Sequence, residues 1–393
     1  MASSPTLRGT PPDCCDDSPS VRIFTLDKLG VTETDSLTSV IERGLPEQGY
    51  LWIACTRSEF EQTQAQIQTG LQALCNMQLV DLHLSDLLNQ QLPSHYDYTS
   101  QYDILVFRRL AASGKERESV QGDLPASHLP SRGGPPILRR IDTSPVGFAV
   151  FDQVLLTVHP SDCSIRDAYA AKLLNSASAV TRGAGTYLPS GPADMMLRIV
   201  NQMVDGYLEL RRELSHQLDH WQTELLDPKT RFNNWASLLQ ARLSLHYLDE
   251  ICEDQRAAVQ DWIESLKTWP DATTSTAQRD RDLLQVRSRD VLEHIERVVH
   301  HVRRLEQSTE AAVQMHFNAQ SHRTSEIMRT LTVLTAIFLP LNLIAGIFGM
   351  NFEFIPFLHQ SNGFWFAMGA MLLTAVVLVL VFSRKRYLER SAR

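Results

Sequence analysis

An uncharged stretch near the C-terminus places the strongest constraint on how this chain can fold. Residues 330–352 include no charged side chain, and their number, about 23, is enough for a helix to cross the ~30 Å hydrocarbon core of a bilayer. A second run without charge, 363–383, has the length that another crossing needs. The sequence therefore predicts two transmembrane helices, 327–351 and 363–383, joined by an outer loop at 352–362.

The first predicted span carries a polar stripe. Its members recur at steps of three and four, so they share one helical face. The stripe consists of Ser325, Met328, Thr332, Thr335, Leu339, Asn342, Gly346 and Gly349. An unpaired polar group in lipid is costly, so this face belongs against another helix or against water. Helix packing accounts for the small and hydroxyl residues. The mid-span amide of Asn342 needs several partners and favours pore lining over simple packing.

The end of this span resembles a known family. Residues 338–353, FLPLNLIAGIFGMNFE, are similar to the first transmembrane segment of CorA-type divalent metal-ion transporters, whose hallmark is a Gly-Met-Asn triplet at the outer helix end. Here the triplet is Gly349, Met350 and Asn351, and a short loop, a second span and a basic tail follow it. The resemblance implies that this triplet is the selectivity motif, with Asn351 meeting the metal ion and Glu353 in the outer loop. It implies a pore lined by Ser325, Met328, Thr332, Thr335, Leu339 and Asn342.

The N-terminal half predicts a mixed α/β domain over 21–190, after a disordered tail, 1–20, that is rich in Pro, Ser and Asp. A segment of Gly, Pro, Ser and charged residues, 112–136, predicts a mobile loop. Apolar runs predict strands, an amphipathic run predicts a helix, and the last two strands form a hairpin. These elements are the helix 58–77 and the strands 50–54, 102–110, 146–151 and 154–160. Their order is similar to that of the N-terminal domain of the same family.

Long helices are predicted over 191–326. The last of them begins near Ala277 and meets no helix breaker before Pro340, so it continues into the first span. Apolar positions along it alternate steps of four and three, which is typical of a heptad packing seam. The seam consists of Val291, Ile295, Val298, Val302, Leu305, Thr309 and Ala312.

Composition and motifs argue against several function classes. A net charge of −8 and a pI of about 5.9, without a basic patch, give no support for nucleic-acid binding. The chain has no P-loop and no G-x-S-x-G motif, so we expect that it is not an enzyme and has no resident cofactor. His159 is interpreted as a strand-end residue rather than a base. Five histidines lie on the last long helix without the converging ligands of a zinc site, at positions His294, His300, His301, His316 and His322.

The basic tail 384–393 predicts the membrane topology. Arg384, Lys385 and Arg386 directly follow the second span, so by the positive-inside rule this end is cytoplasmic. Two crossings place the N-terminal domain on the same side, which makes both termini cytoplasmic in a multi-pass protein of the cell (inner or plasma) membrane. The resemblance implies a funnel-shaped homopentamer in contact with membrane lipid. It would pass divalent cations, Mg²⁺ above all and also Co²⁺ or Ni²⁺, down their electrochemical gradient.

Two alternatives differ from this interpretation. A Zn²⁺ transporter of the same architecture would share the long helical region while varying the middle of the triplet. A membrane-anchored sensor or scaffold that does not conduct would tolerate substituted pore positions. The polar Asn342 argues against the scaffold, because a scaffold has no reason to keep an amide within the bilayer.

Overall fold

The computed structural model describes residues 21–27, 30–34, 36–111, 141–162, 164–180, 188–226, 235–270, 274–350 and 363–384. The chain divides into two compact units. The first joins Met1–Trp221 to Arg231–Thr309, and the second joins Gln222–Thr230 to Glu310–Arg393. The predicted tail 1–20, mobile loop 112–136 and outer loop 352–362 lie outside the described residues, as does the basic tail beyond Arg384.

A seven-stranded sheet forms the centre of the first unit, in the order β2-β1-β3-β7-β6-β5-β4. The strands are β1 (Arg22–Asp27), β2 (Gly30–Thr34), β3 (Gly49–Thr56), β4 (His95–Tyr98), β5 (Asp103–Leu110), β6 (Thr143–Val150) and β7 (Val154–His159). Only the pair β3 and β7 is parallel among these strands. β6 and β7 form an antiparallel hairpin closed by a hydrogen bond of 2.9 Å from the Phe151 amide to the Val154 carbonyl. This hairpin confirms the one predicted from the sequence.

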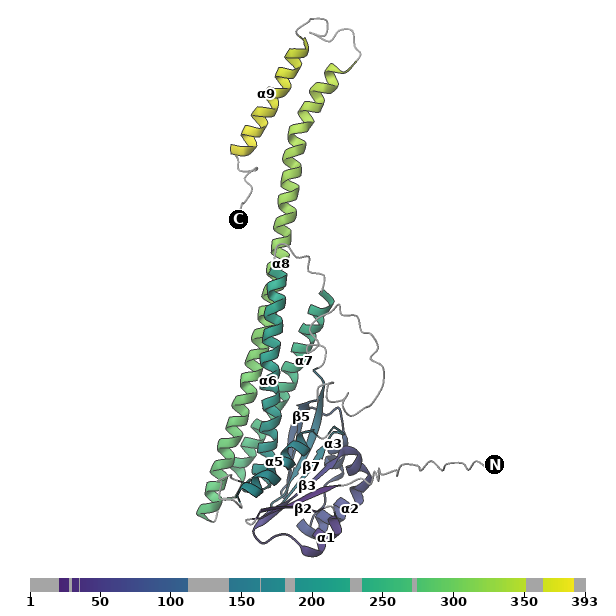
Figure 1. Cartoon of the computed structure of the whole chain (residues 1–393), viewed down its shortest axis with the longest axis vertical. Helices are drawn as coiled ribbons and strands as arrows, with labels where there is room; N and C mark the ends of the chain where they lie inside the picture. The colour runs from purple at the N-terminus through teal and green to yellow at the C-terminus, as the bar shows by residue number, and fades with distance from the viewer. Residues whose placement is uncertain are drawn as a thin grey trace, which may run out of the picture. The chain divides into compact units, whose positions relative to one another are not determined.

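Three shorter helices cover one face of the sheet: α1 (Leu37–Arg43), α2 (Arg57–Cys75) and α3 (Asp81–Leu88) (Figure 1). Thr56 and Glu59 form a capping box that starts α2 directly at the end of β3. Ile53 of β3, Ile67 of α2 and Leu87 of α3 belong to the same buried cluster. α3 approaches β6 so closely that a Cβ at Gly147 would lie 2.3 Å from a methyl carbon of Leu87, so a larger residue there would force the Leu87 side chain to move.

Further helices follow the strands along the chain, and the first of them meets the opposite face of the sheet. They are α5 (Ser164–Val180), α6 (Pro192–Leu226), α7 (Trp235–Thr268) and α8 (Ser275–Phe348), and α9 (Gly363–Arg384) follows them. Trp52 of β3 stacks on Phe24 and meets the ring of Tyr169 from α5 edge to face. The Tyr207 hydroxyl of α6 and the Gln255 amide of α7 both donate to the carbonyl oxygen of Arg108 in β5, at 3.0 and 2.7 Å. One backbone acceptor therefore fixes two long helices to the sheet.

The predicted heptad seam of α8 is confirmed, since all seven of its positions, from Val291 to Ala312, are buried. Trp262 of α7 lies against the same helix and donates a hydrogen bond of 3.0 Å to the Ser288 hydroxyl. The mixed α/β N-terminal region and the long helices agree with the fold class expected from the sequence. The strands β1, β2 and β4 and the helices α1, α3 and α5 were not predicted.

Candidate functional site

α8 carries the predicted pore-lining segment. The helix is continuous from Ser275 to Phe348, so it passes through Pro340. Proline has no amide hydrogen, so the carbonyl of Ala336 loses its usual helical donor without ending the helix. By length and composition α8 and α9 could each cross a membrane, and these are the two candidate spans found among the described residues.

The predicted pore positions belong to the second compact unit, and all of them are exposed to solvent. Ser325, Met328, Thr332, Thr335, Leu339 and Asn342 are exposed along one face of α8. The large apolar side chains among them, Met328 and Leu339, are 60% and 69% exposed. An exposed stripe of this kind is available to neighbouring copies or to water.

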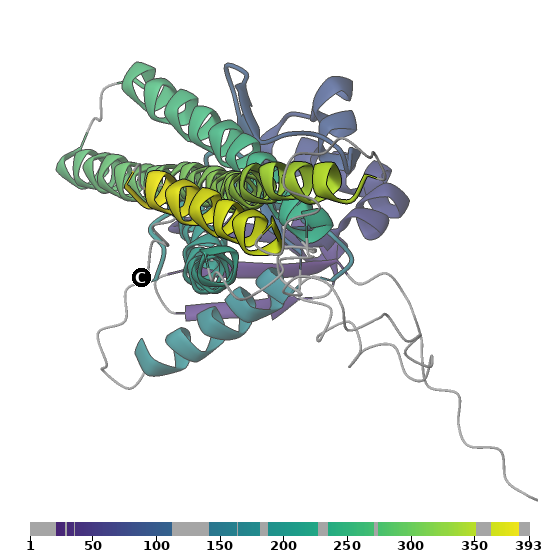
Figure 2. The same cartoon turned by 90° about the horizontal axis from the view of Figure 1, so that it is seen from above.

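The opposite face of α8 is less exposed than the stripe, with Val333 buried and the other positions half-buried. Its less exposed positions recur at steps of four and three and are Val333, Ile337, Pro340, Ile344 and Phe348. α9 has a matching series in Ala367, Met371, Thr374, Leu378 and Phe382. Figures 1 and 2 both show α9 alongside this part of α8. The positions of the polar stripe belong to neither series.

Hydrogen bonds within α8 orient the threonines of the stripe. The hydroxyl of Thr332 donates to the carbonyl of Met328 at 2.7 Å, and that of Thr335 donates to Leu331 at 2.8 Å. A hydroxyl has one hydrogen and two acceptor lone pairs. Since the hydrogen is used on the backbone, each threonine presents acceptor capacity to the stripe face. Acceptors suit a cation or the hydrogens of its water shell.

The helix ends at the predicted selectivity motif. Gly349 and Met350 directly follow the last helical residue, Phe348, and the amide of Gly349 donates to the Ala345 carbonyl at 2.9 Å. A Cβ at Gly349 would lie 3.1 Å from that carbonyl oxygen, so a larger residue would crowd the helix end. Asn351, the proposed metal contact, and Glu353 lie outside the described residues.

The other candidate side chains serve structural roles. His159 ends β7, is fully buried, and places its Nε2 atom 3.0 Å from the Thr157 hydroxyl. Burial lowers the pKa of His159 to about 3, so the ring is neutral near pH 7. His301 lies 2.7 Å from the Ser215 hydroxyl, and His316 lies 2.8 Å from the Leu225 carbonyl oxygen. Among the described residues no group of three or more His, Cys, Asp and Glu side chains is placed to hold a metal ion.

Sequence reasoning missed two features of this molecule. The less exposed positions of α8 recur at steps of four and three. This period could not be recognised in the sequence, because apolar residues lie on every side of the span. A pocket in the first unit combines Tyr169, Arg198 and Arg287 from three helices, and nothing in their spacing joins them.

Comparison with known proteins identifies the same family along nearly the whole chain. The family model described as CorA-like Mg²⁺ transporter protein matches residues 47–386. The Cobalt/magnesium transport protein CorA of Thermotoga maritima is 26% identical over 204 residues, which are 50% of this chain and 53% of that protein. The protein of the same name from Methanocaldococcus jannaschii is 24% identical over 248 residues, 63% of this chain and 73% of its own length. Thus the chain spans about half of the first of these relatives.

Two solved structures have a similar fold. The complete structure of the CorA magnesium transporter from Methanocaldococcus jannaschii has a TM-score of 0.64 at 17% identity, covering 93% of this chain and 98% of that one. The full-length CmaX protein has a TM-score of 0.55 at 17% identity, and the match covers 95% of this chain and 100% of that one. The family match extends over far more than half of the sequence, and the fold agrees with it. The chain therefore belongs to the CorA-like Mg²⁺ transporter family, whose members are ion transporters rather than enzymes.

Proposed function

We propose that this protein lets Mg²⁺ cross a membrane down its electrochemical gradient. The observation that carries the proposal is the division of α8 into two faces. The apolar series from Val333 to Phe348 is buried or half-buried, whereas the polar stripe from Ser325 to Asn342 is exposed. The names of the relatives from Thermotoga and Methanocaldococcus add Co²⁺ as a second substrate to test.

A conducting path requires several copies of the chain. Two spans cannot enclose water, so copies must surround an axis with their stripes facing inward. The resemblance to the family sets a homopentamer as the expected assembly. Each stripe residue then becomes a ring of identical groups, from Asn351 at the outer mouth through Asn342 and Leu339 to Met328 and Ser325.

The chemistry of these rings fits a strongly hydrated divalent ion. Mg²⁺ releases its waters reluctantly, so neutral amide and hydroxyl oxygens can bind it through its water shell. Neutral rings do not trap the ion as a ring of carboxylates would. Leu339 and Met328 form apolar constrictions that close the path by dewetting. A potential of 100 mV, negative inside, favours entry of a divalent ion by about 4.6 kcal/mol, twice the value for one charge.

The proposed topology follows the charge distribution. Arg384 ends α9, and the basic residues after it support a cytoplasmic location for this end by the positive-inside rule. Two crossings at 327–351 and 363–383 put the α/β domain, 21–190, and the helical region, 191–326, on the same side. The loop 352–362 then faces outward.

Uptake by the purified protein tests the proposal and its alternatives together. Liposomes loaded with a metal-sensitive dye are supplied in turn with Mg²⁺, Co²⁺, Ni²⁺ and Zn²⁺, and empty liposomes serve as the control. We expect Mg²⁺ uptake and a native mass in detergent equal to a closed ring of copies. Uptake of Zn²⁺ alone would support the zinc-transporter alternative. Absence of uptake for every ion would support the scaffold.

A further inference from the structure

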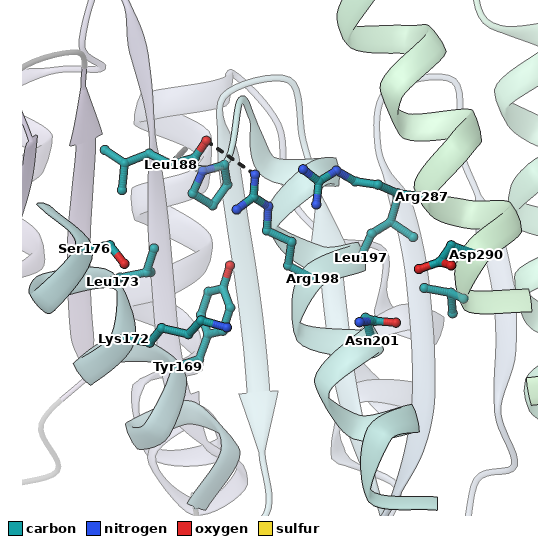
Figure 3. Close-up of a pocket in the computed structure, with 12 residues that line it drawn as sticks. Tyr169, Lys172, Leu173, Ser176, Leu188, Leu197, Arg198, Asn201, Arg287 and Asp290 are labelled. Atoms are coloured by element: carbon teal, nitrogen blue, oxygen red, sulfur yellow. Dashed lines mark hydrogen bonds between the residues drawn. The ribbon is translucent and has the colours of Figure 1, made fainter. Parts of the chain in front are cut away.

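A pocket of about 270 Å³ lies between α5, α6 and the N-terminal part of α8, within the first unit (Figure 3). Polar and cationic side chains from all three helices line it: Tyr169, Lys172, Ser176, Arg198, Asn201 and Arg287. Apolar side chains, among them Leu173 and Leu188, complete the wall. Its size is a little below the ~300–1,000 Å³ of pockets for drug-sized ligands, which indicates a small ligand.

Two guanidinium groups at this pocket share one buried carboxylate. Asp194 is 2% exposed, and Arg198 and Arg287 approach its two oxygens at 3.2 and 2.8 Å. The amide of Ser190 also donates to Asp194 at 3.0 Å. Among the described residues around the pocket, Lys172, Arg198 and Arg287 bring three positive charges and Asp194 and Asp290 bring two negative charges, so the described side chains carry a surplus of one positive charge. Two like charges held close together at a partly buried site favour an additional anion.

The Tyr169 hydroxyl is an unsatisfied donor at the same place. The side chain is 4% exposed, and its hydroxyl has no hydrogen-bond partner in the part of the chain that the structure describes. Figure 3 shows this hydroxyl pointing into the pocket, on the side of Arg198. Burial raises the pKa of Tyr169, so the hydroxyl keeps its proton near pH 7. A tyrosine hydroxyl that opens into a pocket can donate to an acceptor bound there.

Two further groups lack partners around the pocket. The amide oxygen of Asn201 is buried without a hydrogen bond. Rotation of that amide would present its NH₂ group instead, so the side chain can also donate. The ammonium group of Lys172 is exposed and makes no ion pair with a described residue. The carboxylate of Asp290 is 58% exposed and therefore screened by solvent.

We propose that this pocket binds a small organic phosphate monoester. A phosphate monoester carries a charge of about −1.5 to −2, and its oxygens accept hydrogen bonds, which matches the donors and surplus positive charge described above. Tyr169 and Asn201 donate to the phosphate, while Lys172, Arg198 and Arg287 supply the charge. The apolar side chains of the pocket wall, among them Leu173 and Leu188, contact the organic part of the phosphate monoester. This site is separate from the proposed ion path and does not depend on transport.

The test is calorimetric titration of the full chain in detergent with glycerol 3-phosphate. Metal-free buffer removes any contribution from chelation, and glycerol is the uncharged control. Tyr169→Phe deletes only the unpartnered hydroxyl, and Lys172→Met deletes only an exposed charge, so neither disturbs the Asp194 ion pairs. Tyr247→Phe and Lys267→Met are matched controls on α7, away from the pocket.

We expect saturable binding of glycerol 3-phosphate and none of glycerol. Loss of a hydrogen bond to a charged group predicts that Tyr169→Phe weakens binding by about tenfold or more. Lys172→Met should weaken binding and reduce its salt dependence, and both controls should bind as the wild type does. Absence of binding at millimolar glycerol 3-phosphate would overturn the proposal. Equal affinity in the wild type and both pocket variants would also overturn it.

Discussion

The hydroxyl of Thr332 donates a hydrogen bond of 2.7 Å to the carbonyl oxygen of Met328, one helical turn earlier. The hydroxyl hydrogen of Thr332 therefore points toward the helix backbone, and its oxygen lone pairs can accept hydrogen bonds from the water shell of an ion in the proposed path. Thr332→Val removes this acceptor from every copy while keeping a branched side chain. At about 1 kcal/mol for the lost hydrogen bond, we expect Mg²⁺ uptake into liposomes to fall by about fivefold.

Thr330 provides a matched control for this prediction. Its hydroxyl also donates to a carbonyl one turn back, that of Glu326, at 2.9 Å. The side chain points to the other side of α8, because two residues along a helix correspond to about 200° of rotation. Thr330→Val should therefore leave uptake unchanged. Equal losses in the two variants would mean that the threonines act through helix stability rather than through the path.

The second prediction concerns the attachment of α6 to the sheet. Tyr207 and Gln255 donate to the same Arg108 carbonyl, so removal of one donor leaves the acceptor satisfied by the other. Tyr207→Phe should lower the free energy of unfolding by only about 1 kcal/mol. Chemical denaturation of the full chain in detergent measures the change. A loss above about 3 kcal/mol would show that the two donors do not substitute for one another.

The third prediction is a pH dependence of stability that His159 produces. Burial, assisted by Arg166, Arg109 and Arg57, lowers the pKa of His159 to about 3 in the folded chain. An unfolded histidine has a pKa of about 6.5, so between these values the unfolded state binds more protons. The stability that this group contributes is present above about pH 6.5 and is lost as the pH falls toward 3.

The variant His159→Gln isolates this effect from that of the other ionisable groups. The melting temperature of the wild type should fall between pH 6.5 and 4.5, and that of the variant should fall less. Parallel melting curves for the two proteins over this range would show that His159 is not buried as a neutral ring.

The parts of the structure that the sequence predicted are those with a local signal. The seam through Val298 and Val302 repeats within one helix, and the turn at Asp152 joins strands that are adjacent in the chain. β1 was missed because only half of Arg22–Asp27 is buried, so its apolar signal is weak although its partner β2 follows directly. The ion pair of Asp194 with Arg287 joins two helices that are far apart in the chain, so no sequence spacing could predict it. The role of Asn351 came from the family resemblance and remains a prediction.

The fourth prediction addresses Asn351 directly. Its amide is expected to meet the arriving hydrated ion, although an Asn at a helix end can also act as a C-cap. Asn351→Gly retains the capping ability and removes the ring of amides, so the variant should assemble normally and transport no Mg²⁺. Asn351→Asp should transport with less discrimination among divalent ions, because it adds charge at the mouth. Wild-type uptake by Asn351→Gly would assign this residue to capping.

Voltage-dependent Mg²⁺ uptake tests passive conduction most directly. Purified protein in liposomes is given a fixed external Mg²⁺ concentration, and a K⁺ gradient with an ionophore sets the potential in steps. Neither ATP nor a proton gradient is supplied. A divalent ion gains about 4.6 kcal/mol per 100 mV, twice the single-charge value, so uptake should rise steeply as the interior becomes more negative. Mg²⁺ uptake that does not change with the membrane potential, or that requires a proton gradient, would contradict passive conduction along the α8 stripe.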